Sequence, residues 1–91
     1  MSTLVYASLI EKFVAVLKDQ NKSVFTIVAY KKDLEQFAGY LSSNDLNDIR
    51  DVKKDEISGF INKLVTENYS KKSASRKLNS IRTFFRYLKN E

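Results

Sequence analysis

The sequence predicts an all-α fold of four helices packed as one compact domain. Proline is absent and there are only two glycines, so few residues would break a helix from within. Apolar residues recur every three or four positions in four separate segments, a spacing that places them on one face of a helix. A chain of 91 residues has the length of a single domain and can bury one core without a metal or a disulfide. We therefore expect one domain over residues 1–91.

The first two helices are expected over about 4–19 and 24–41, separated by the polar turn DQNK at 19–22. Ser23 is the expected N-cap of the second helix, because its hydroxyl can accept a hydrogen bond from the free backbone N–H groups of the first turn. The predicted apolar faces comprise Tyr6, Ile10, Phe13, Val14 and Leu17 in the first helix, and Ile27, Tyr30, Leu34, Phe37 and Leu41 in the second.

The polar segment SSNDLNDIRD at 42–51 predicts a connection, with Leu46 and Ile49 turned inward to close it. A third helix is expected over about 54–68, with Asp55 and Glu56 in its first turn, where they suit the helix dipole. A fourth is expected over about 71–89. The apolar faces predicted for these two helices are Val52, Ile57, Phe60, Ile61 and Leu64, and Ala74, Leu78, Ile81, Phe85 and Leu88.

The composition makes several classes of function improbable. Without Cys there is no thiolate site, and without His the commonest metal ligand and general base is missing. No pair of acids shares an apolar face, so we expect no catalytic residue, no metal and no cofactor in this chain. The apolar stretch STLVYASLI is interrupted by Glu11 and Lys12, which excludes a signal peptide or a membrane span and favours a soluble, cytoplasmic protein.

Positive charge is concentrated in the last predicted helix. Residues 70–91 contain seven basic residues and one acid, whereas the remaining 69 residues contain nine basic and ten acidic residues. The formal charge of +5 on the whole chain therefore originates from one element. Such an asymmetry requires either a partner or a coincidence.

These charges lie on one side of the predicted helix. At about 100° per residue, the arc opposite the apolar face contains no acid and alternates basic with short polar residues: Lys72, Ser75, Arg76, Asn79, Arg82, Thr83 and Arg86. Lys72 and Arg76, and Arg82 and Arg86, are like-charged pairs at a spacing of four, which a purely solvated face has no reason to keep. A solvated helix remains an alternative. A membrane-surface helix is disfavoured because the core requires its apolar face.

Nucleic acid fits this face best. Arg and Lys neutralise phosphates, and Asn, Ser and Thr can contact base edges in a major groove that admits one helix. The second helix can add Thr26 near its positive dipole end, with Lys31 and Lys32. Val28 and Ala29 could touch thymine methyl groups or be ordinary surface residues. The candidate DNA-contacting residues are Thr26, Lys31, Lys32, Lys71, Lys72, Ser75, Arg76, Asn79, Arg82, Thr83 and Arg86.

The order and spacing of several motifs resemble the N-terminal core-binding domain of tyrosine recombinases, the phage integrase family. The motifs are Ser23-x-x-Thr26-x-x-x-Tyr30-x-x-Asp33-Leu34-x-x-Phe37, then Phe60-Ile61-x-x-Leu64, then Ser73-x-x-Arg76-x-Leu78-x-Ser80-Ile81-Arg82-x-Phe84-Phe85-x-Tyr87-Leu88. The resemblance implies a SAM-like four-helix domain that clamps recombination-site duplex DNA, with its second and fourth helices toward the major groove.

The resemblance also implies that the chain is one domain of a longer integrase. The catalytic domain of the same parent chain would carry the DNA-cleaving tyrosine, neighbouring recombinase subunits would be further partners, and the protein would be nucleoid-associated when bound to DNA. A different function remains open, namely a helical protein-interaction domain whose basic face docks an acidic partner.

Overall fold

The computed structural model describes residues 2–46 and 49–89, with the side chains of residues 2–5 and 49 outside the description. Its elements are α1 (Ser2–Asp19), α2 (Val24–Ser43), a 3₁₀ turn η1 (Ile49–Asp51), α3 (Lys54–Thr66) and α4 (Lys71–Lys89). The described residues form no strand, so the all-α prediction is confirmed. Among the described residues, every helix is too short or too polar to be a transmembrane span.

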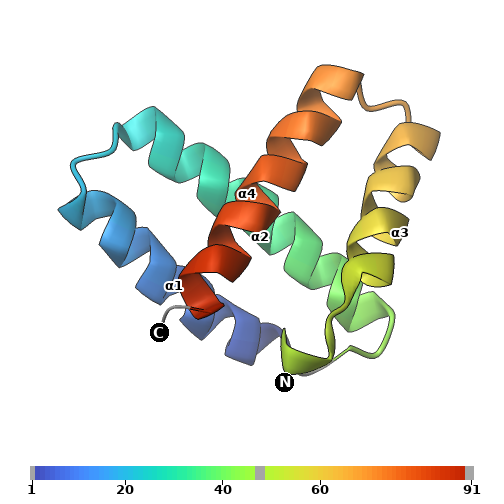
Figure 1. The fold of residues 1–91 in the computed structure, drawn as a ribbon, viewed down its shortest axis with the longest axis horizontal. Helices are drawn as coiled ribbons and strands as arrows, with labels where there is room; N and C mark the ends of the chain where they lie inside the picture. Colours follow the sequence, from blue (N-terminus) through green and yellow to red (C-terminus); the bar gives the residue numbers. More distant parts are fainter. Residues whose placement is uncertain (1, 47–48, 90–91) are drawn as a thin grey trace.

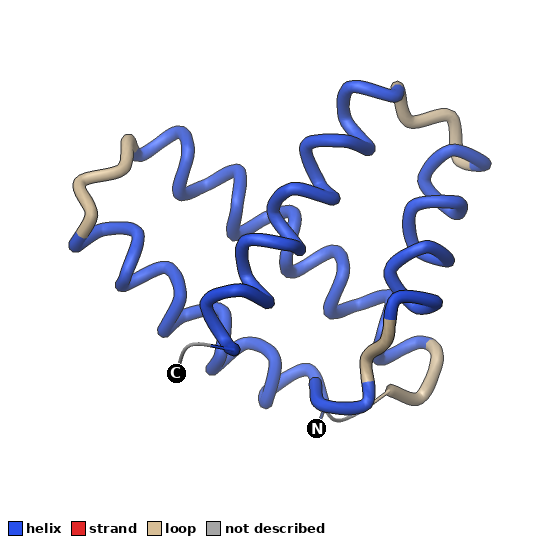
Figure 2. The backbone as a smooth tube through the Cα atoms, in the orientation of Figure 1, coloured by secondary structure: helices blue, strands red, loops and turns tan. Residues whose placement is uncertain are grey.

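Helix α4 lies steeply across α2, whereas α1 and α2 run side by side (Figure 1). The hairpin of α1 and α2 forms one half of the domain, α4 crosses over α2, and α3 runs beside α4. Figure 2 shows that the connections are short except for the one between α2 and α3, which contains η1. Along one side of α4 the side chains remain exposed, among them Lys72, Asn79 and Arg86.

Helix boundaries follow local chemistry. Ser23 caps α2 as predicted, since its Oγ accepts from the Thr26 backbone N–H at 3.1 Å. The third helix is shorter than predicted and ends at Thr66, because Asn68 adopts a left-handed conformation with φ of 70°. Asn21 after α1 and Asp45 after α2 have φ of 59° and 61°, so short polar residues end all three helices.

The start of α3 uses a carboxylate instead of a hydroxyl cap. The Glu56 carboxylate accepts a hydrogen bond from the Lys53 backbone N–H at 3.1 Å, while a lysine at the cap position has no side-chain acceptor of its own. Leu46 is half-buried and packs against the core as expected. The side chain of Ile49 lies outside the described residues.

Aromatic side chains connect all four helices. The Phe13 ring of α1 contacts Tyr30, Phe84 and Tyr87, with ring centroids 5.7, 5.4 and 5.3 Å away. The Phe37 ring of α2 contacts Phe60 of α3 at 5.1 Å. Because Phe84 and the neighbouring Phe85 belong to the two groups and lie 5.9 Å apart, the core is continuous.

The buried face of α4 differs from the predicted one. Phe84 is buried and was not predicted to be, whereas Leu78, Phe85 and Leu88 are only half-buried. Two polar residues, Lys77 and Ser80, are also buried. The predicted face was therefore rotated slightly around the helix, because polar residues were assumed to lie outside.

These polar residues surround Asp33, which is fully buried on α2 where α4 crosses it. The Asp33 carboxylate accepts hydrogen bonds from Lys77 Nζ at 2.9 Å and from Ser80 Oγ at 2.9 Å. Arg76 donates to the same carboxylate through Nη2 at 2.9 Å and Nε at 3.3 Å. Among the described residues, no buried side-chain polar atom lacks a partner. The polar cluster of Asp33, Arg76, Lys77 and Ser80 thus joins α2 to α4.

Opposing effects act on the pKa of Asp33. Burial raises it, but hydrogen bonds from Lys77, Arg76 and Ser80, together with the charge of Lys77, outweigh burial and hold the pKa below its ordinary value. Because the folded-state pKa is the lower one, the stabilisation is fully present above the unfolded-state pKa of about 3.9 and is lost as the pH falls through the folded-state value.

We therefore predict that the urea midpoint of the domain falls as the pH is lowered from about 4. In the double variant Asp33→Asn/Lys77→Met, which removes both ends of the buried pair, this acid-induced fall should be smaller. Urea titrations at a series of pH values from neutral to acidic measure both curves. Equal falls in the two proteins would contradict the prediction.

A second prediction compares the two glycines, both in helix interiors. A Cβ on Gly39 would meet nothing within 4 Å, so Gly39→Ala should stabilise the domain by about 0.5–1 kcal/mol through its better helix propensity. A Cβ on Gly59 would lie 2.7 Å from Tyr40 Oη, which would have to move. The Tyr40 ring packs on Phe60 at 5.3 Å, so moving it offsets the gain. In thermal unfolding, Gly39→Ala should have a clearly higher melting temperature than Gly59→Ala. The reverse order would contradict this account.

Candidate nucleic-acid interface

The outer side of α4 presents basic and polar side chains to solvent. Lys71, Lys72, Ser75, Asn79, Arg82 and Arg86 are all exposed, as predicted for a face opposite the core. Within the described part of the chain, Lys72, Arg82 and Arg86 make no ion pair. Their positive charges are therefore not neutralised by the described acids of this domain.

The start of this helix has a cap that the sequence could have revealed. Ser70 Oγ accepts from the Ser73 backbone N–H at 3.1 Å and donates to Ser73 Oγ at 3.1 Å. A serine directly before a helical apolar repeat is the usual N-cap signal. The cap fixes where α4 begins and hence which residues share its outer side.

Arg76 is exposed but not free. Its side chain is 56% exposed while its guanidinium is bound to the buried Asp33 carboxylate. Lys77 contributes no charge to the surface, because its side chain is 8% exposed and it binds the same carboxylate. The formal charge of the last segment therefore overstates the charge that a partner would meet. Asp33 could have been noticed in the sequence as an acid within the apolar face formed by Tyr30, Leu34 and Phe37.

A groove between α3 and α4 extends the basic surface. It has a volume of about 470 Å³ and is lined by Lys54, Ile57, Ser58, Ile61, Asn62, Leu78 and Arg82. None of these lining residues is acidic. Lys54 was not among the candidate residues, because its position near Arg82 depends on how α3 packs beside α4.

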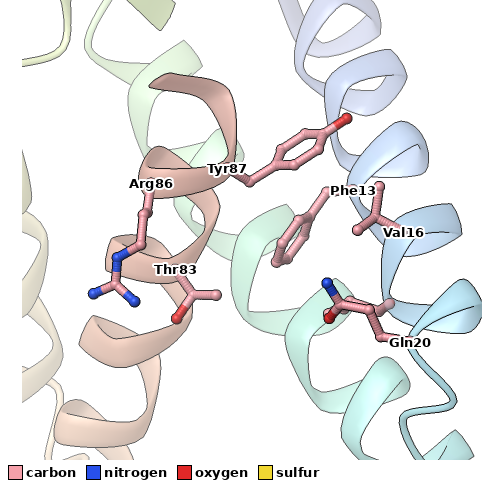
Figure 3. A pocket seen from close by; sticks show the side chains of 7 residues that line it. Phe13, Val16, Gln20, Thr83, Arg86 and Tyr87 are labelled. Atoms are coloured by element: carbon pink, nitrogen blue, oxygen red, sulfur yellow. The ribbon is translucent and has the colours of Figure 1, made fainter. Parts of the chain in front are cut away.

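A smaller groove of about 280 Å³ lies between α1 and α4. Figure 3 shows Tyr87 pointing toward α1, whereas the guanidinium of Arg86 extends away from Phe13. Thr83 lies in this groove, is half-buried and donates its hydroxyl to the Asn79 carbonyl at 2.8 Å. Thr83 is thus directed more toward α1 than toward the outer side of α4.

The candidate residues of α2 do not form one surface. Thr26 is half-buried in the cap, where its hydroxyl accepts from Ser23 Oγ at 2.9 Å, and Lys32 is exposed. Lys31 is directed toward α1, since its Nζ lies 3.2 Å from the Glu11 carboxylate. Val28 lines a groove with α1 residues, so it is not grouped with the outer side of α4. Nothing in the sequence pattern indicated that Phe25, in the first turn, would be 89% exposed.

The arrangement can attract and hold an anionic surface by charge and hydrogen bonding. Its exposed groups are ammonium and guanidinium donors with neutral amide and hydroxyl groups between them. In the described residues, no three Cys, His, Asp or Glu side chains gather to hold a metal ion.

Known proteins similar to this chain include several tyrosine recombinases. Residues 10–91 match the family described as phage integrase, N-terminal SAM-like domain. The chain is 36% identical over 83 residues to the tyrosine recombinase XerC of Oceanobacillus iheyensis, covering 90% of this chain and 27% of that protein. It is 34% identical over 85 residues to the tyrosine recombinase XerD of Listeria monocytogenes, covering 91% and 29%.

A tyrosine recombinase of Pseudothermotoga lettingae is 40% identical over 65 residues, covering 69% of this chain and 22% of that protein. The chain thus spans about a quarter of the length of the curated relatives it matches. No solved structure matches it significantly. Since the family match covers most of the chain and its helical architecture agrees, the chain belongs to the phage integrase family as an N-terminal SAM-like domain.

Proposed function

We propose that this domain is the DNA-binding module of a tyrosine recombinase and contacts duplex DNA through the outer side of α4. The observation that carries the proposal is the set of exposed basic residues on that side, of which Lys72, Arg82 and Arg86 form no ion pair with any described residue. Phosphates are the natural partners of such a row, and the major groove is wide enough for one helix.

The first half of α2 offers a secondary contact through the half-buried Thr26 and the exposed Lys32. The Thr26 hydroxyl and Lys32 lie in the first half of that helix, whose N-terminal end carries a positive partial charge. Lys31 has a smaller role, because it already pairs with Glu11. The groove beside α3 adds Lys54 to the surface on the other side of Arg82.

In this proposal the chain itself binds DNA and does not cleave it. The catalytic domain belongs to the same parent chain, and neighbouring recombinase subunits assemble on the same DNA in the cytoplasm, at the nucleoid. The family membership and the recombinase relatives support this placement. Affinity of the isolated domain should be modest, with a Kd of roughly 10⁻⁴ to 10⁻⁶ M at physiological salt, because few phosphates are contacted.

The proposal predicts how charge removal changes binding. Replacing Lys72, Arg82 and Arg86 together with alanine should weaken duplex binding and flatten the plot of log K against log salt by up to about 0.9 for each phosphate that is no longer neutralised. Fluorescence anisotropy with a labelled duplex at several salt concentrations measures both. The control is Lys12→Ala/Lys18→Ala on exposed positions of α1, which removes two charges instead of three, so the losses are compared per charge removed. If the control weakens binding as much as the triple change, the interface lies elsewhere.

The same titrations distinguish duplex DNA from the alternative partner, an acidic protein. If the outer side of α4 instead docks an acidic protein, the wild-type domain should bind duplex DNA only non-specifically, with equal affinity for a cognate recombination site and a scrambled duplex. That result would overturn the proposed function.

Asn79 should behave differently from its basic neighbours. It is exposed at the middle of the outer side, and a neutral amide can read a base edge but neutralises no phosphate. Asn79→Ala should therefore cost about 1–3 kcal/mol on a cognate recombination site and leave the salt slope unchanged. Parallel titrations of a cognate and a scrambled duplex give the difference. Equal loss on both duplexes would show that Asn79 reads no base.

A further inference from the structure

Arg76 differs from the other basic residues of the outer side because one edge of its guanidinium is already bound. Nε and Nη2 both donate to Asp33, at 3.3 and 2.9 Å, which is the two-point geometry that a carboxylate and a guanidinium form best. The end-on edge, made by Nη1 and the second hydrogen of Nη2, has no hydrogen bond within the described residues. With a side chain 56% exposed, this edge is accessible from outside.

The charge of Arg76 also survives its pairing. The Asp33 carboxylate is shared with the buried Lys77, so two positive charges face one negative charge. Because Lys77 is the buried member and Arg76 the exposed one, the surplus positive charge is presented at Arg76. An ordinary surface ion pair would have no such surplus.

The groups packed against Arg76, Asp33 and Lys77, are themselves held in place by neighbouring side chains. Asp33 is fully buried and receives a further hydrogen bond from Ser80 at 2.9 Å. The Tyr69 ring covers Lys77, with Nζ 5.6 Å from the ring centroid, and Tyr69 Oη accepts from Gln36 Nε2 at 3.1 Å. An unanchored arginine loses rotamer entropy when it is fixed by a ligand. Arg76 has already met most of this cost on folding.

We propose that Asp33 is a positioning residue for DNA binding, which holds Arg76 so that the end-on edge of its guanidinium donates to one phosphate group. Asp33 itself touches no DNA. Lys72, Arg82 and Arg86 attract the backbone through charge from flexible side chains, whereas Arg76 fixes the register of the domain on the duplex. This inference rests on the proposed function and adds to it a division of roles among the basic residues.

The direct test uses lysine in place of arginine, because lysine keeps the charge but lacks the planar fork whose one edge binds the carboxylate at two points while a second edge faces a phosphate. Arg76→Lys should weaken duplex binding about tenfold, the effect of losing one charge-assisted hydrogen bond, with an unchanged salt slope. Arg82→Lys is the matched control and should stay within about twofold of wild type. Thermal melts establish that both variants are folded. Wild-type affinity for Arg76→Lys would overturn the inference.

A charge-neutral variant tests Asp33 itself. Asp33→Asn/Lys77→Met removes one negative and one positive charge, so overall electrostatics predicts no change in affinity, whereas loss of positioning predicts about the same weakening as in Arg76→Lys. The Nε–H signal of Arg76 in ¹⁵N NMR spectra should exchange slowly with water in the wild-type domain and rapidly in this variant. A folded variant with unchanged affinity would overturn the inference, and if the variant does not fold, Arg76→Lys alone decides.

Failure of this inference is distinguishable from failure of the proposed function. If Arg76→Lys binds normally while the alanine triple variant at Lys72, Arg82 and Arg86 binds poorly, α4 still contacts DNA and only the positioning role is wrong. If the triple variant also binds normally, the proposed interface itself is wrong.

Discussion

The polar cluster of Asp33, Arg76, Lys77 and Ser80 is the interaction on which the candidate interface depends. It fixes α4 across α2 at one point along both helices, because a buried carboxylate must keep its partners within hydrogen-bonding distance. Hydrophobic contacts alone would tolerate a small slide or rotation of α4. Any such rotation would change which basic residues face outward.

The two sides of the domain differ in whether their basic residues have acidic partners. On the α1 side, Lys31 is paired with Glu11, and the aromatic ring of Tyr87 fills the space toward Phe13. On the α4 side, Lys72, Arg82 and Arg86 have no acidic partner among the described residues, and the residues that line the groove beside α3 include no acid. The domain therefore has a strong electrostatic polarity although its total charge is only +5.

The helical periodicity predicted the existence of all four helices and most core positions, because those depend on local spacing. It failed for residues whose burial or orientation is set by tertiary contacts. Lys77 looks like a surface residue, and Asp33, although it stands within an apolar face, has no visible partner in the sequence until the crossing of α2 and α4 brings the two together. Lys54 and Thr83 differ from expectation for the same reason, since one is brought beside Arg82 by α3 and the other is turned toward α1. The end of α3 was misplaced because Asn68 leaves the helical conformation.

Mapping chemical-shift changes on the ¹⁵N-labelled domain during titration with duplex DNA tests the central claim most directly, because it locates the contact surface without altering any residue. The account predicts that the largest changes follow the outer side of α4 from Lys72 through Asn79 to Arg86, with smaller ones at Thr26 and Lys32. Changes centred instead on the exposed side of α1, around Lys12 and Lys18, would contradict it.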